Sequence, residues 1–106
     1  MPLKDPPTEP PIKPQARFVR GSFIVLNDKG MHTRPCTELV KCANTFKAHT
    51  NLIFQDLVVN AKSLLGVLTL AAIQGSFIEI ESTGEDAEEA VATLVELAHN
   101  KFYIHY

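Results

Sequence analysis

The amino-acid sequence predicts an α+β fold, an open-faced β-sandwich in which a four-stranded antiparallel sheet carries three helices on one face. The hydrophobic patterns along the chain follow the order strand, helix, strand, strand, helix, strand, helix, which favours this arrangement. Ile78 and Ile80 alternate with Glu79 and Glu81, which indicates a strand with one face in water. A length of 106 residues with 45% hydrophobic content is typical of one globular domain.

Residues 1–16 differ from the rest of the chain in composition. They hold all but one of the 7 prolines, mixed with charges and few apolar side chains. Such a segment buries too little apolar surface to fold, so we expect a disordered or polyproline-like tail followed by a domain at 17–106. A solvated extension is the simpler interpretation of the tail, and recruitment of a partner through a proline-rich motif is the alternative.

The first strand is predicted from Phe18 to Leu26, a run rich in Phe, Val and Ile that ends in the turn residues 27–30. Apolar residues at helical spacing then predict a helix from about Thr33 to Asn44. Pro35 suits the first turn of that helix, because the N–H that proline lacks would have no intrahelical partner there. Thr33 is a candidate N-cap.

The middle of the chain predicts a hairpin and a short helix. Two apolar runs at 52–54 and 57–59 are separated by Gln55-Asp56, which is hairpin spacing but a poor pair for a type I′ turn. This pair favours a longer or bulged loop and leaves the turn type open. Ser63 is a candidate N-cap for the leucine-rich segment 64–72. This segment has too many leucines for one face, so they form either an exposed docking surface or a patch buried under a loop.

The remaining elements are a strand at 77–81 and a helix after Gly84 with an apolar stripe from Ala87 to Ala98. Asp86 and Glu89 resemble a capping box for that helix. The last five residues, 102–106, either cap the core or fray.

Composition excludes several classes of function. A net charge of −2 without a basic cluster makes nucleic acid an unsuitable partner. No apolar run has the length of a membrane span or signal segment, so we expect no membrane insertion and a cytoplasmic protein. Cys36 and Cys42 are too few for a disulfide framework and are interpreted as reduced and structural.

The run Gly30-Met31-His32-Thr33-Arg34-Pro35 carries the chemistry. It places His32 beside the free N–H groups of a helix N-terminus, which stabilise anions. An imidazole nitrogen attacks phosphorus readily, and the Arg34 guanidinium can hold phosphoryl oxygens, so phosphoryl transfer suits this site. His32 and Cys36 could form half of a metal site, but the other half is missing, and a cysteine nucleophile would lack an oxyanion hole. The sequence contains neither the G-x-G-x-x-G motif nor a P-loop, the two familiar nucleotide-binding motifs. We expect no metal and no cofactor.

Three motifs resemble the HPr family, the histidine-containing phosphocarrier proteins of the bacterial phosphoenolpyruvate-dependent sugar phosphotransferase system. They are Gly30 to Pro35, Val59 to Leu68 and Gly84 to Ala87, in family order and spacing. The resemblance implies the same fold, and it implies that His32 accepts phosphate on Nδ1 from phosphorylated enzyme I, with Arg34 assisting. His32 then passes the group to a sugar-specific enzyme IIA. Such a protein is a stoichiometric carrier, not an enzyme, and is expected to be a monomer.

The resemblance also implies regulation and contacts. Ser63 matches the serine that HPr kinase/phosphorylase modifies in many bacteria, although a plain N-cap role is compatible with the same position. Positions matching partner contacts are Thr33, Lys41, Leu64, Leu65 and Leu68. Lys29, Cys36 and Ala71 depart from common family residues. The competing interpretation is a regulatory HPr-like module that controls enzymes or transcription factors without transporting sugar, and His32 favours retained carrier chemistry.

Overall fold

A computed structural model describes residues 17–106, so the predicted proline-rich tail lies outside the described part. Four strands form one antiparallel sheet in the order β1-β4-β2-β3, with β1 at Arg17–Ile24, β2 at His49–Phe54, β3 at Leu57–Asn60 and β4 at Phe77–Gly84. The helices are α1 at Thr33–Ala43, α2 at Leu64–Leu68 and α3 at Ala87–His99, followed by a short 3-10 turn, η1, at Lys101–Tyr103. The predicted α+β open-faced sandwich is confirmed.

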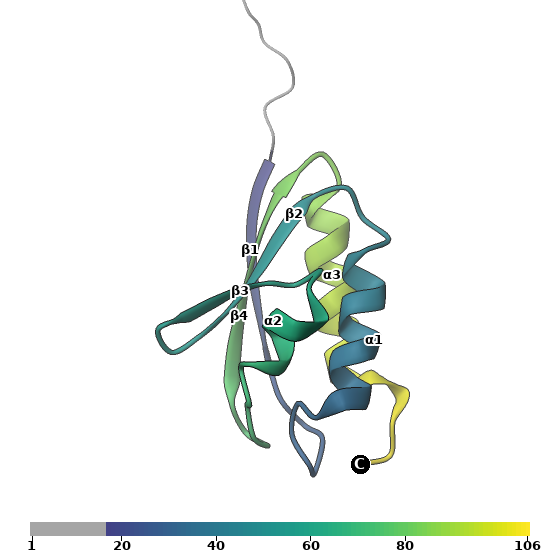
Figure 1. Cartoon of the computed structure of the whole chain (residues 1–106). Coiled ribbons are helices and arrows are strands. Elements are labelled where there is room, and N and C mark those ends of the chain that lie inside the picture. The colour runs from purple at the N-terminus through teal and green to yellow at the C-terminus, as the bar shows by residue number, and fades with distance from the viewer. Residues whose placement is uncertain (1–16) are drawn as a thin grey trace, which may run out of the picture.

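The helices all cover the same face of the sheet (Figure 1). Alternate strand residues point into this layer, and Leu52, Ile78 and Ile80 are fully buried there. On the helical side, Leu39 of α1 and Leu94 of α3 are also fully buried. The opposite face of the sheet is open, as the alternation of isoleucine and glutamate in β4 predicts.

The hairpin between β2 and β3 is confirmed, but the longer or bulged loop is wrong, because the turn is a two-residue loop. Phe54 pairs with Leu57, which leaves only Gln55 and Asp56 between the strands. Gln55 has a φ of 56°, whereas Asp56 is not among the positive-φ residues. A type I′ turn needs positive φ at both central positions, so the poor fit of Gln-Asp to that turn agrees with the structure.

The helix after Ser63 is shorter than the leucine-rich segment. It ends at Leu68, and Ala71 then adopts a φ of 49°, which a right-handed helix cannot contain. Leu64 and Leu65 are exposed, whereas Leu70 is buried. The leucines therefore serve two purposes, core packing and an exposed surface.

The predicted capping box at α3 is wrong. Asp86 is the N-cap residue, but its side chain makes no capping hydrogen bond. Its carboxylate instead accepts the backbone N–H of Lys47 and of Ala48, each at 2.8 Å. These hydrogen bonds hold the pKa of Asp86 below its ordinary value of 3.8, and the hydrogen bond from Lys47 has the largest effect. A loop distant in sequence thus takes the carboxylate away from the helix.

The C-terminal segment caps the core, which decides between the two alternatives left open by the sequence. Phe102 and Ile104 are buried, and the ring of Phe102 meets the ring of Phe23 edge to face, with centroids 6.2 Å apart. The chain after α3 then runs beside the start of α1 (Figure 1).

Candidate functional site

The loop before α1 is fixed by a close approach of two backbones. Gly30 has a φ of 70°, and a Cβ at this position would lie 2.5 Å from the carbonyl oxygen of Ala72. The N–H of Met31 donates to the same oxygen at 2.8 Å, and the buried Met31 side chain joins the core. A glycine is required here both for its backbone conformation and for its lack of a side chain. The loop therefore presents His32 from a rigid support.

His32 is itself the N-cap of α1, so the prediction of Thr33 as the cap is wrong. His32 has extended backbone angles, with φ −86° and ψ −169°, and its carbonyl accepts the N–H of Cys36 at 3.1 Å. Thr33 is the first helical residue, and its hydroxyl makes no cap. The first N–H groups of a helix have no intrahelical partner, so they remain available beside the imidazole. The first turn contains no acidic residue, which keeps this end of the helix favourable for an anion.

The two ring nitrogens of His32 differ in their surroundings. Nε2 is buried and has no hydrogen-bond partner within residues 17–106, whereas Nδ1 is not among the buried unpartnered atoms of these residues. The residue as a whole is only partly buried. An attacking nitrogen must be reached by the incoming phosphorus, so this orientation favours Nδ1 as the nucleophile.

One aromatic side chain stacks on the imidazole, and two cationic side chains contact that aromatic residue. Tyr106 stacks on His32, with ring centroids 5.2 Å apart and an angle of 25° between the planes. Nη1 of Arg34 donates to the hydroxyl of Tyr106 at 3.0 Å, and Nζ of Lys29 lies 5.0 Å from the Tyr106 ring centroid. Two positively charged side chains therefore contact the tyrosine that stacks on the histidine.

Ser63 is placed at the opposite end of the paired helices. It caps α2, as predicted, by accepting the N–H of Gly66 at 3.1 Å. Nδ2 of Asn44, at the end of α1, donates to the carbonyl of Lys62 at 3.2 Å, whereas the start of α1 is bound to Ala72 beyond α2. Because an 11-residue helix is about 16 Å long, Ser63 and His32 are separated by roughly that length.

The predicted partner residues lie on these two helices. Leu64 is 37% and Leu65 is 76% exposed, and Leu68 is partly buried. Lys41 is exposed in the last turn of α1, where its Nζ lies 3.4 Å from a carboxylate oxygen of Glu38. Ile73, which the sequence analysis did not single out, is 72% exposed and lies against Gly30. It is therefore an exposed apolar side chain beside the loop that carries His32.

The cysteines are unsuited to chemistry at this site. Burial raises the pKa of the Cys36 thiol to about 11 and also raises that of Cys42. The thiol of Cys36 donates to the carbonyl of Met31 at 3.3 Å. Among residues 17–106, no three His, Cys, Asp or Glu side chains gather as metal ligands would. The same span contains no helix with the length and apolar character of a membrane crossing.

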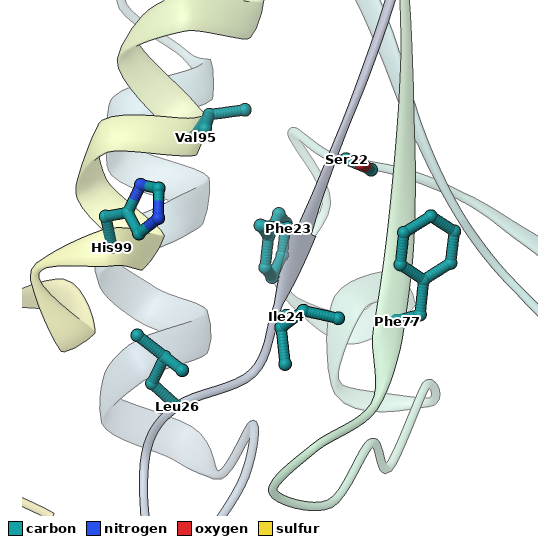
Figure 2. A pocket seen from close by; sticks show the side chains of 7 residues that line it. All are labelled: Ser22, Phe23, Ile24, Leu26, Phe77, Val95 and His99. Carbon is teal, nitrogen blue, oxygen red and sulfur yellow. The ribbon is translucent and has the colours of Figure 1, made fainter.

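An apolar hollow of about 380 Å³ lies elsewhere, between β1 and α3 (Figure 2). Phe23, Val95 and His99 are among the side chains that line it. None of the residues that we predicted for the site takes part in this hollow.

Tyr106 and Lys29 are the site residues that sequence reasoning missed in this role. The aromatic run at 102–106 was the available signal, but its position depends on contacts with a loop more than 70 positions earlier in the chain. Ile73 gave no signal, because an apolar residue next to a turn is equally compatible with burial.

Comparison with known proteins places the chain in a family. A family model described as "PTS HPr component phosphorylation site" matches residues 19–100. The phosphocarrier protein HPr of Xylella fastidiosa is 42% identical over 85 residues, which cover 80% of this chain and 96% of that protein.

Solved structures agree with this match. HPr-C-His from Thermoanaerobacter tengcongensis has a TM-score of 0.79 at 31% identity, covering 83% of this chain and 99% of that chain. Crh, the catabolite repression containing protein of Bacillus subtilis, has a TM-score of 0.64 at 31% identity, covering 70% of this chain and 85% of that chain. The chain therefore belongs to the HPr family, the phosphocarrier proteins of the phosphotransferase system.

Proposed function

We propose that this protein accepts a phosphoryl group on Nδ1 of His32 from phosphorylated enzyme I and donates it to a sugar-specific enzyme IIA. The observation that carries the proposal is the orientation of His32, whose Nε2 is buried while the ring lies at the start of α1 beside Arg34. Family membership supplies the phosphocarrier role, and the local geometry supports the choice of residue and atom.

Phosphoryl transfer to His32 is a substitution at phosphorus in which His32 is the nucleophile. With the imidazole proton on Nε2, the lone pair of Nδ1 attacks phosphorus. The bond between phosphorus and the donor atom breaks as the new phosphorus–nitrogen bond forms, and its electron pair remains with the donor atom. Arg34 and the first N–H groups of α1 stabilise the phosphoryl oxygens as negative charge develops on them. Donation to the next protein reverses these steps, so the carrier is regenerated and acts stoichiometrically.

A contact surface for these partners extends from His32 across α2. Ile73 lies next to the Gly30 loop, and Leu64 and Leu65 continue the exposed apolar surface. Apolar patches of this kind on a small domain mark protein interaction sites. We assign Thr33, Lys41 and Leu68 to the border of this surface. The carrier is proposed to act as a cytoplasmic monomer that meets one partner at a time.

Phosphorylation of Ser63 by HPr kinase/phosphorylase would regulate the carrier through this surface. The roughly 16 Å between Ser63 and His32 makes direct interference with the imidazole ineffective at physiological salt, where charges are screened within about 8 Å. A phosphate beside the exposed Leu64 and Leu65 would instead add about −2 charge where partners dock. Reduced partner affinity is the expected result.

A regulatory module without sugar transport is the second candidate. The similarity to Crh, a protein named for catabolite repression, favours considering it. A purely regulatory protein would have no need of a reactive His32. Here Arg34 and Lys29 both contact the tyrosine that stacks on His32, which supplies positive charge suited to an anion. Carrier chemistry is therefore the preferred function.

Incubation with phosphoenolpyruvate and enzyme I tests the proposal. The protein should acquire an acid-labile phosphoryl group, and His32→Ala should abolish it. His49→Ala is the matched control, because His49 is an exposed histidine on β2, away from the start of α1. Equal labelling of His32→Ala and the unchanged chain would refute the carrier role of His32. Transfer onward to an enzyme IIA then separates a carrier from a regulator that is merely phosphorylated.

A further inference from the structure

The turn after α3 has an unusual backbone. Lys101, Phe102 and Tyr103 have φ values of 55°, 57° and 58°, and none of them is a glycine. Residues with a Cβ disfavour this left-handed region, and three in succession are rare. Such a conformation persists only where surrounding contacts determine it, and these outliers gather at functional sites.

Several contacts hold this turn in place. The ring of Phe102 is 1% exposed and packs against Phe23. Nδ2 of the fully buried Asn27 donates to the carbonyl of Lys101 at 3.0 Å. The N–H of Ile104 donates to that same carbonyl at 3.0 Å, and Ile104 itself is buried. The turn therefore reverses the chain and directs residues 104–106 toward the start of α1 (Figure 1).

Tyr106 completes this arrangement at the histidine. Its carbonyl accepts the N–H of Lys29 at 3.1 Å, its ring stacks on His32, and its hydroxyl accepts Nη1 of Arg34. The family match ends at residue 100, so the turn and Tyr106 lie beyond it. Nζ of Lys29 contacts the ring of Tyr106. The C-terminal residue and the loop before α1 thus meet at the proposed phosphoryl acceptor.

We propose that Tyr106 is a positioning residue for phosphoryl transfer at His32. Its ring holds the imidazole in the orientation that buries Nε2, and its hydroxyl occupies Arg34 until a phosphoryl group arrives. A phosphoryl oxygen is a stronger acceptor for a guanidinium than a neutral phenol, so Arg34 turns from Tyr106 to the new phosphohistidine. This inference rests on the proposed carrier function of His32.

Two substitutions separate the ring from the hydroxyl. Tyr106→Ala removes both and should lower kcat/KM for phosphorylation by enzyme I about fivefold, the size expected for one lost aromatic pair. Tyr106→Phe keeps the ring, so its rate should stay within about twofold of the unchanged chain. Without the hydroxyl, Arg34 is free for the phosphoryl group, and the equilibrium constant for phosphoryl transfer from enzyme I to His32 should rise about threefold. A merely structural tyrosine would leave this equilibrium unchanged in the Phe variant.

Tyrosine emission gives a second readout. The chain has no Trp and 2 Tyr, and Tyr103 is 72% exposed, so Tyr103→Phe leaves Tyr106 as the only emitter. Phosphorylation of His32 should change the emission of Tyr106 in this background, because its hydroxyl loses Arg34. Adding Arg34→Lys, which removes the planar guanidinium, should reduce that change.

The outcomes distinguish this inference from the carrier function. The positioning role would be overturned, and the carrier function left intact, if His32 of the unchanged chain is labelled efficiently but the substitutions have no effect. In that case Tyr106→Ala has the same kcat/KM as the unchanged chain, Tyr106→Phe has the same equilibrium constant, and the emission of Tyr106 stays constant on phosphorylation. Failure of the unchanged chain to be labelled at His32 would overturn both. A lower kcat/KM for Tyr106→Ala, together with a nearly unchanged kcat/KM and a raised equilibrium constant for Tyr106→Phe, would support the role of Tyr106.

Discussion

Substitution of Gly30 by alanine is expected to damage both the fold and the site. An alanine with φ near 70° incurs about 1.5 kcal/mol of backbone strain, offset by about 0.7 kcal/mol because alanine restricts the unfolded chain. Its Cβ would lie 2.5 Å from the carbonyl oxygen of Ala72 and 2.9 Å from the Cα of Ile73. Both are backbone atoms that cannot rotate away, so overpacking adds about 2 kcal/mol. The total loss of unfolding free energy is about 3 kcal/mol.

Gly75 supplies a matched control. Its φ is 90°, but a Cβ there would have nothing within 4 Å, so Gly75→Ala should lose only about 1 kcal/mol. Urea unfolding followed by far-ultraviolet circular dichroism measures both variants. Phosphorylation of His32 is measured without urea, at a temperature where both variants are folded. It should be slowed in Gly30→Ala alone, because the hydrogen bond from the N–H of Met31 to the carbonyl of Ala72 is displaced. Equal destabilisation of the two variants would refute the close-approach argument.

Three further predictions concern other parts of the fold. Ala71→Gly should stabilise the protein by about 0.5–1 kcal/mol in urea unfolding, because glycine relieves the φ of 49°, and a loss of stability would contradict the strain argument. Ser63→Ala should lose about 1 kcal/mol of unfolding free energy, because the hydrogen bond that caps the N–H of Gly66 is removed. Ser63→Asp should keep this cap and weaken binding to enzyme I through its added negative charge. Equal binding of enzyme I by the two variants would contradict charge-based regulation. Asp86 has a lowered pKa when folded, so its contribution to stability is present above 3.8 and is lost as the pH falls through the folded value. The stability difference between the unchanged chain and Asp86→Asn should therefore shrink on acidification to about pH 2, and a constant difference would contradict this linkage.

Features that are local in sequence could be predicted, and those set by distant contacts could not. The helix after Pro35 and the hairpin around Gln55-Asp56 follow from periodicity and spacing, and the Ser63 cap follows from residue type. The Asp86 carboxylate, by contrast, has its donors 38 and 39 positions away, so a local capping motif misled the prediction.

The candidate site divides in the same way. His32 and Arg34 belong to one contiguous motif and could be identified from the sequence. The position of Tyr106 depends on the left-handed turn at Lys101–Tyr103, and that turn depends on Asn27 and the Phe23 ring. No local pattern encodes three positive φ angles in residues that disfavour them. The stacking of Tyr106 on His32 could therefore be found only from the structure.

Nδ1 of His32 is proposed to carry the phosphoryl group. Phosphorus NMR correlated with the imidazole protons, recorded after treatment with phosphoenolpyruvate and enzyme I, identifies both the residue and the nitrogen. We expect a single phosphoryl group bonded to Nδ1 of His32. A phosphoryl group on Nε2 of His32, or on any of the other histidines, would contradict it.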